Sequence, residues 1–178
     1  VLTQAREVTD ATAAFMVNSG AAAAGLRDVK HKYADAPWWT SIRGEFSGDI
    51  LKYPVWVVRL ALPFFDNGTP WNHDPIPVLK AVSAPQLWML AEQDLEAPHA
   101  ETVRRLATLA DSGHEITTVV FPDTDHGIVE FETAPDGTRT KTRYADGYLQ
   151  MTMDWIRDGQ LADRTYGRAL VSPPVPAR

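Results

Sequence analysis

Two residue types that move protons in enzymes each follow a short apolar run. The run Leu87–Leu90 leads to Asp94, and the run Val119–Phe121 leads to His126. A histidine can take a proton from a hydroxyl group and later return it, while a carboxylate holds the imidazole in the required tautomer. Asp94 and His126 are therefore the candidate acid–histidine pair of this sequence.

A helical segment separates the two apolar runs. It follows His99, is stopped by Gly113, and carries small and apolar residues on one predicted face: Ala100, Val103, Leu106, Ala107 and Ala110. The runs do not alternate with polar residues, which is typical of parallel strands buried on both faces. The pattern predicts a β-α-β unit, and ligands of such sheets bind outside the carboxyl ends of the strands, where both candidates fall.

The other acidic residues near the pair are interpreted as structural and not catalytic. Asp123 and Asp125 are predicted to be loop carboxylates, and Glu92 and Glu96 to be neighbours that solvate the loop; Glu92 or Asp125 would be next in line as the acid. The structural alternative for Asp94 itself is a turn or helix-cap residue, and for His126 an ordinary loop histidine.

The remaining histidines have no motif around them: His31, His73, His99 and His114. His73 stands beside Asp74, but no second pair follows at the spacing of metal ligands. A loop histidine is therefore the favoured interpretation of His73, and no metal or other cofactor is predicted.

Three segments resemble motifs of the α/β-hydrolases. Ala91–Pro98 is similar to the G-x-x-D-x-x-V-P segment that carries the acid, and Phe121–Gly127 to the F-P-x-x-x-H-G segment that carries the histidine. Asp74–Pro85 resembles the D-P-x-x-x-L-x-x-V-x-x-P lead-in to the acid strand. The resemblance covers roughly Asp74 to Gly159, and implies that Asp94 is the acid and His126 the base of a catalytic triad.

The sequence departs from these motifs at two positions, Ala91 where glycine is usual and Ala97 where valine or isoleucine is usual. It also lacks the nucleophile. The triad of this family runs in the order nucleophile, acid, histidine, with the serine in G-x-S-x-G, and no serine here has that context; Gly44–Gly48 comes nearest but has the wrong spacing.

The expected fold class is α/β: cap helices plus the C-terminal β-α-β part of an α/β-hydrolase sheet, a fragment of a larger three-layer domain. The nucleophile, the oxyanion donors and the first strands would precede Val1. The implied function is serine hydrolysis of an ester, thioester or amide through an acyl-enzyme, of the dienelactone-hydrolase or prolyl-oligopeptidase type. The alternative is a non-catalytic binding or assembly module on a hydrolase-like scaffold.

The chain divides into three predicted regions: a mainly helical cap over 1–73, the sheet portion over 74–160 and an extended tail over 161–178. In the cap, helices are expected from Ala5 to about Val17 and from Ala21 to about Tyr33, with a short buried helix within Tyr53–Phe65.

Further elements are expected after the sheet's second strand. A hairpin is predicted from Ile128–Thr133 and Arg139–Arg143 around an Asp-Gly turn. A last helix is expected to end near Gly159, with four residues on one face: Tyr148, Met151, Thr152 and Trp155.

Adjacent indoles at Trp38 and Trp39 admit two readings. One is packing in the core, since aromatic side chains bury large areas. The other is an apolar wall that binds a bulky substrate group, which makes both candidate substrate-binding residues. Trp56 and Trp71 carry the same ambiguity.

Composition narrows the partners. The 178 residues are 44% hydrophobic and 22% charged with a net charge of -6, typical of a soluble globular protein without the basic surface that nucleic acids require. The absence of cysteine excludes disulfides, thiolate catalysis and cysteine-bound zinc. No apolar run is close to the length of about 18 residues that a membrane-spanning helix needs. The expected substrate is a small molecule or peptide with an apolar group. The chain could also pair with a second copy of itself or with the missing N-terminal portion. The sequence does not indicate the cellular compartment.

Overall fold

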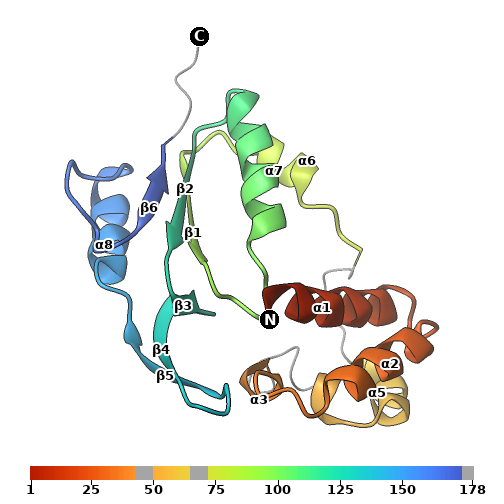
Figure 1. Cartoon of the computed structure of the whole chain (residues 1–178). Coiled ribbons are helices and arrows are strands. Elements are labelled where there is room, and N and C mark those ends of the chain that lie inside the picture. Colours follow the sequence, from red (N-terminus) through yellow and green to blue (C-terminus); the bar gives the residue numbers. More distant parts are fainter. Residues whose placement is uncertain (43–49, 65–71, 174–178) are drawn as a thin grey trace. The chain divides into compact units, whose positions relative to one another are not determined.

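The computed structural model describes residues 1–42, 50–64 and 72–173, and contains both helices and small sheets (Figure 1). The chain is therefore α/β in the broad sense. It forms two compact units. The helical unit comprises Val1–Asp74, Leu95–Ala97 and Thr133–Arg139, and the sheet unit comprises Pro75–Asp94, Pro98–Glu132 and Thr140–Arg178. Gly44–Gly48 and Trp71 lie outside the described residues.

Within its described residues, the helical unit includes the longer helices α1 (Leu2–Val17) and α2 (Ala23–Tyr33). It also includes shorter helical elements: α3 (Trp39–Ile42), α5 (Val55–Ala61) and the 3-10 turn η1 (Leu62–Phe64). The two predicted N-terminal helices are confirmed, although α1 begins three residues earlier than expected and α2 two residues later. The buried residues of α1 recur at helical spacing: Ala5, Val8, Thr12, Phe15 and Met16. Gly20, with φ +83°, ends this segment by donating its N–H to the Phe15 carbonyl at 2.8 Å.

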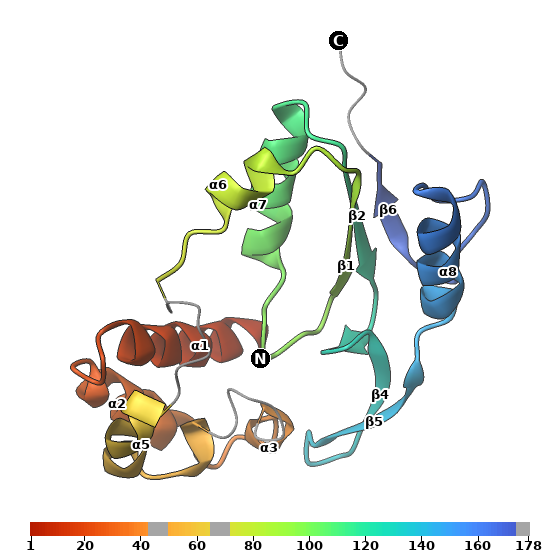
Figure 2. The same ribbon diagram turned by 180° about the vertical axis from the view of Figure 1, so that it is seen from behind.

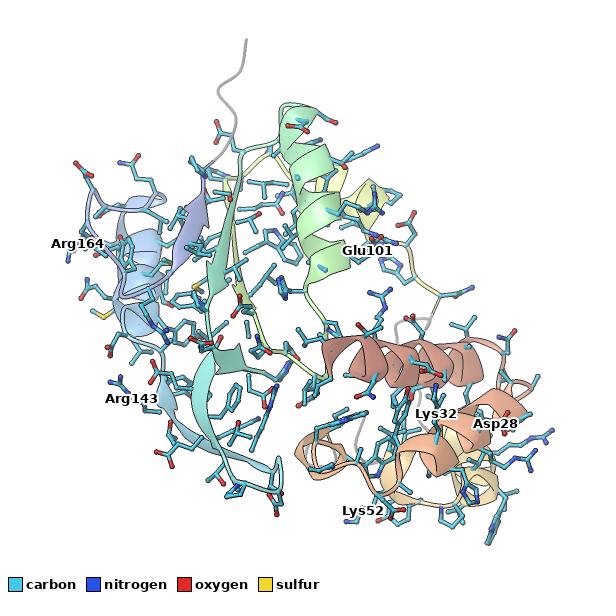
Figure 3. All side chains as sticks on the ribbon, in the orientation of Figure 1. Asp28, Lys32, Lys52, Glu101, Arg143 and Arg164 are labelled. Carbon is cyan, nitrogen blue, oxygen red and sulfur yellow. The ribbon has the colours of Figure 1, made fainter. Side chains whose placement is uncertain are left out.

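Polar contacts join α1 to α2 at their exposed edge. The ammonium of Lys32, labelled in Figure 3, lies 2.8 Å from a carboxylate oxygen of Glu7, and the Tyr33 hydroxyl donates to the same carboxylate. These contacts hold the pKa of Glu7 below its ordinary value, first through the Lys32 hydrogen bond and then through that of Tyr33. They fix how α2 lies against α1.

The segment predicted as a short buried helix is helical, but much of it is exposed. Val55 and Val58 of α5 are buried, whereas Trp56, Leu60 and Phe64 are 67%, 69% and 87% exposed. The prediction of burial was wrong because α5 packs on one face only, and an apolar sequence does not provide a second packing partner. Exposed aromatic residues therefore gather along α5 and η1.

The sheet unit is built on the predicted β-α-β segment. Strand β1 (Gln86–Ala91) pairs with β2 (Ile116–Phe121) in parallel, from Gln86 opposite Ile116 to Ala91 opposite Phe121. Helix α7 (Ala100–Asp111) connects them, and β6 (Leu170–Ser172) pairs with β2 in the antiparallel direction. Both predicted strands and the helix between them are confirmed, and each strand is longer than its apolar run.

Apolar side chains of β1 pack on both faces of this sheet. Leu87 and Met89 contact the core that includes Met151 of α8 (Tyr148–Asp158). Trp88 and Leu90 contact the core formed by α7 and α6 (Ile76–Ala81) on the opposite face. Figure 1 shows α8 on one side of the sheet and α6 with α7 on the other, and Figure 2 shows the same layers from behind.

The buried face of α7 differs in part from the predicted one. Leu106 and Ala110 are buried as expected, but Ala100 and Ala107 are exposed, and Leu109 is buried although it was not predicted to be. The helix turns its larger side chain toward the sheet, since leucine buries more apolar area than alanine.

A second small sheet follows β2: β3 (Thr124–Asp125), β4 (Val129–Thr133) and β5 (Arg139–Tyr144). The predicted hairpin is confirmed. Its turn is closed by the Ala134 N–H bonded to the Thr138 carbonyl at 2.9 Å, and by the Thr138 N–H bonded to the Asp136 carboxylate at 2.9 Å.

The segment after α8 was predicted to be an extended tail, and for Leu161 to Pro173 this is wrong. Tyr166 is only 4% exposed and its hydroxyl donates to Asp154, a fully buried carboxylate of α8, at 2.8 Å. Beyond it the chain forms β6. Asp154 was not among the residues predicted for the buried face of α8. A buried carboxylate is stable only when hydrogen-bond donors, such as the Tyr166 hydroxyl, compensate for its lost hydration. Residues 174–178 lie outside the described part.

Candidate active site

The loops that carry the acid and the histidine are joined by their backbones. At the ends of β1 and β2, the Glu92 N–H donates to the Phe121 carbonyl at 3.0 Å, and the Gln93 N–H donates to the Thr124 carbonyl at 2.9 Å. The ladder between the parallel strands therefore continues past the strands into both loops. This continuation fixes the backbone directly before Asp94 relative to the backbone directly before His126.

Asp94 and His126 meet at the carboxyl ends of β1 and β2. The Oδ2 atom of Asp94 lies 2.9 Å from Nδ1 of His126. The Asp94 side chain is 10% exposed, whereas that of His126 is 44% exposed. The carboxylate is thus enclosed while the imidazole is open to solvent.

This contact selects one tautomer of the neutral imidazole. An ionised carboxylate only accepts hydrogen bonds, so Nδ1 of His126 must carry the proton that it donates to Asp94. The lone pair then resides on Nε2, the nitrogen that acts as general base in a serine triad. The arrangement can accept a proton at Nε2 and stabilise the resulting imidazolium through Asp94.

Asp125 holds the histidine loop by its backbone. It is 3% exposed, and its Oδ1 accepts the backbone N–H of His126 at 2.8 Å. After it, Gly127 has φ +81° and Ile128 has φ +61°, so the chain turns sharply before entering β4. The ring of His126 is bonded by Asp94, while Asp125 bonds the backbone of the same residue.

Glu92 bridges the two loops. Its Oε2 accepts the backbone N–H of Asp123 at 3.1 Å, and Asp123 in turn pairs with Arg168 at 2.7 Å. Asp123 is thus the loop carboxylate that the sequence predicted, although its φ of +54° and its ion pair were not foreseeable from composition. The role of Glu92 in joining the loops was likewise missed, since no local pattern marks it.

Trp38 and Trp39 lie in the core of the helical unit. They are 5% and 6% exposed, with ring centroids 6.1 Å apart, and Trp38 also contacts Tyr33 at 5.3 Å. Their burial favours the core-packing interpretation. A substrate-binding role for the two indoles stays a prediction.

The other histidines have separate places in the chain. His73 is exposed, His99 directly precedes α7, and His31 lies on the exposed surface of α2. Among the described residues, no three histidine or acidic side chains lie close enough to share a metal ion. In the same part of the chain, no helix is both long and apolar enough to cross a membrane.

No family model, no curated protein and no solved structure matches the chain. The geometry of Asp94 and His126 and the sequence motifs around them are therefore the observations that bear on function.

Proposed function

We propose that Asp94 and His126 are the acid and the base of a serine hydrolase of the α/β-hydrolase superfamily. The observation that carries the proposal is the 2.9 Å contact between Asp94 Oδ2 and His126 Nδ1, made at the carboxyl ends of two parallel strands. The order of the two residues along the chain supports it, because the acid precedes the histidine in this superfamily.

In the proposed reaction, Nε2 of His126 removes the proton of a serine hydroxyl as its oxygen attacks the carbonyl carbon of an ester, thioester or amide. The tetrahedral intermediate collapses when His126 returns that proton to the leaving group, which departs and leaves an acyl-enzyme. A water molecule then attacks by the same route and releases the acid. Asp94 stays ionised throughout and stabilises the imidazolium.

The serine is proposed to come from residues other than these 178, together with the oxyanion donors and further strands. No serine of the sequence stands in G-x-S-x-G. Strand β1 is evidence for the additional strands. It is apolar on both faces, and within the described part of the chain it pairs with β2 along one edge. Parallel strands that are covered on both faces are ordinarily interior strands.

Reaction of the native polypeptide with a fluorophosphonate probe, followed by intact mass, tests the proposal. We expect a native mass above the 19.7 kDa of these residues and one covalent adduct. His126→Ala should slow labelling by at least about 10³-fold, and Asp94→Asn should slow it by a comparable factor. His73→Ala is the matched control, since His73 is an exposed loop histidine, and its labelling rate should not change.

The 178-residue chain alone provides a second test. Without a serine to activate, it should hydrolyse an activated ester no faster than its His126→Ala variant. A clear rate difference would show that the nucleophile lies within these residues.

A native polypeptide of about this mass that takes up no adduct would reject the hydrolase. The alternative, a binding or assembly module on a hydrolase-like scaffold, would then account for the chain. Substrates with an apolar group, and pairing with a second copy, are further proposals that the probe does not address.

A further inference from the structure

The helical unit contains a pocket of about 560 Å³ between α2 and the start of α5. One wall of it is formed by α2 and the residue directly after this helix: Ala23, Arg27, Lys30, His31 and Ala34. Their spacing follows the helix, so the pocket lies along nearly the whole length of α2. The small side chains of the two alanines leave room for the pocket at its ends, and the basic residues lie between them.

The opposite wall comes from the chain that enters α5. Pro54, Val55 and Trp56 supply apolar surface, and Arg59 adds another guanidinium. Trp56 is 67% exposed, although an indole buries a large apolar area wherever a partner is present. The pocket therefore has an apolar wall that is open to a ligand.

Every charged or titratable residue that lines the pocket is basic, although the whole chain has a net charge of -6. Lys30 directs its ammonium at the Tyr53 carbonyl, at 2.5 Å. Within the part of the chain that the structure describes, the side chains of Arg27 and Arg59 have no ion-pair partner. A local excess of positive charge beside apolar surface attracts an anion that also has an apolar body.

Arg59 is held in place by its own stem. A Cβ atom added at Gly20 would lie 3.0 Å from Cγ and 3.4 Å from Cδ of Arg59, so the aliphatic part of the arginine packs against the glycine that follows α1. The stem is thus fixed by packing, while the residue as a whole stays exposed.

We propose that this pocket binds a small amphiphilic anion, with a carboxylate or phosphate group at Arg27 and Arg59 and an aliphatic or aromatic body against Trp56. The size supports a small molecule, since ligand sites ordinarily measure about 300–1,000 Å³. The inference is independent of the hydrolase proposal, because it uses no residue of the Asp94–His126 pair.

Fluorescence titration of the 178-residue chain with 8-anilino-1-naphthalenesulfonate, an aromatic anion, tests the charge requirement. Arg27→Gln and Arg59→Gln should each weaken binding about two- to fivefold, and the double variant more. Lys52→Gln is the matched control: Lys52, labelled in Figure 3, is an exposed cation of the same unit that does not line the pocket. Equal weakening by Lys52→Gln, or no weakening by either arginine variant, would overturn the proposal.

The apolar wall is tested by Trp56→Ala against Phe64→Ala. Both side chains are exposed, so neither change should unfold the chain, which circular dichroism checks. Only Trp56→Ala should weaken binding of the anionic dye. The neutral dye N-phenyl-1-naphthylamine should bind the arginine variants as tightly as it binds the wild type. If the arginine variants weakened binding of both dyes equally, a role for charge would be rejected.

Competition identifies the head group. Decanoate or decyl phosphate should displace the anionic dye, and their relative potency shows which anion fits. Equal displacement by decanol would overturn the proposal, because decanol has no charge. Co-sedimentation with phosphatidylglycerol vesicles without displacement by either monomeric amphiphile would also overturn it, in favour of a membrane-binding surface.

Discussion

Asp94 and Asp125 bond different parts of the same histidine. Asp94 lies 2.9 Å from the Nδ1 atom of the His126 ring, and Asp125 accepts the backbone N–H of His126 at 2.8 Å. Their positions relative to the strands explain the division, since Asp94 comes from the neighbouring loop and Asp125 directly precedes the histidine. A carboxylate next to His126 in sequence is therefore no substitute for one that faces its ring.

Asp94→Asn should change the tautomer of His126. An asparagine amide that faces Nδ1 with its N–H₂ group requires Nδ1 to accept, which moves the proton to Nε2. We expect long-range ¹H–¹⁵N correlation spectra of the neutral imidazole to show Nδ1–H in the wild type and a substantial Nε2–H population in the variant. Asp123→Asn is the control, and an unchanged tautomer in Asp94→Asn would contradict the assigned contact.

Asp154 and Tyr166 form a second buried polar pair. The pKa of Asp154 is lowered, chiefly by the hydrogen bond from the Tyr166 hydroxyl, and the pKa of Tyr166 is raised, chiefly by burial. Gln150 and Arg157 also donate to this carboxylate, and Arg164, labelled in Figure 3, lies 3.4 Å from it. The pair ties the segment after α8 back onto that helix.

Tyr166→Phe should lower the free energy of unfolding by about 1–3 kcal/mol near neutral pH, because one buried hydrogen bond is lost. A lowered carboxylate pKa contributes stability above its ordinary value of about 4, and this is lost as the pH falls. The difference between wild type and variant should therefore shrink below about pH 4. Urea denaturation at several pH values measures it.

Tyr144→Phe serves as the comparison, since Tyr144 is 55% exposed. Its effect should stay within about 0.5 kcal/mol at all pH values. A Tyr166→Phe effect that does not vary with pH would separate the loss of stability from the ionisation of Asp154.

At the scale of elements, the sequence predicted the local units and missed the contacts between distant ones. Strands β1 and β2, helix α7 and the hairpin β4–β5 follow from apolar periodicity and turn residues within short windows. The pairing of β6 with β2 could not be predicted in this way, because the apolar run at Leu170 and Val171 is too short to indicate a strand or to specify its partner. The proximity of Asp94 and His126 was predictable because both follow strands of a single β-α-β unit.

The tail is also held by a close backbone approach. A Cβ atom on Gly147, at the start of α8, would lie 2.4 Å from the carbonyl carbon of Tyr166, a separation that backbone atoms cannot accommodate. Glycine is required here for space as well as for its φ of +85°. The tail therefore passes closely over Gly147, directly before α8, where no side chain projects.

Gly147→Ala should destabilise the chain more than Gly113→Ala does. Both glycines have similar φ values, +85° and +92°, so alanine meets similar backbone strain at each, about 1–2 kcal/mol. A Cβ on Gly113 meets nothing within 4 Å. Overpacking at Gly147 should add about 1–3 kcal/mol, measured by urea denaturation, and equal losses would show that the tail moves away readily.

For the whole molecule, the sheet of β1, β2 and β6 determines how the chain can associate. β2 lies between two strands, whereas β1 has β2 as its partner in the described part of the chain. An apolar strand with one unpaired edge is a surface onto which another strand can add. A strand from a second copy of the chain, or an additional strand of the same polypeptide, could pair with this edge of β1.

Amide hydrogen exchange of the dilute 178-residue chain should reveal this edge. Alternate amides of β1 should be protected through pairing with β2, and the amides between them should exchange quickly. Residues Thr118–Val120 of β2, which have partners on both sides, are the internal control and should be protected throughout. Protection of every β1 amide would mean that its outer edge is already covered.

The joined loops of Asp94 and His126 also have a consequence for folding kinetics. The two residues lie 32 positions apart, and a single closure through α7 brings them together. The entropy lost on closing a loop rises only with the logarithm of its length, and contacts of short sequence separation form early. We therefore expect Asp94 and His126 to come together with the first β-α-β unit, before contacts with segments that lie farther away along the polypeptide.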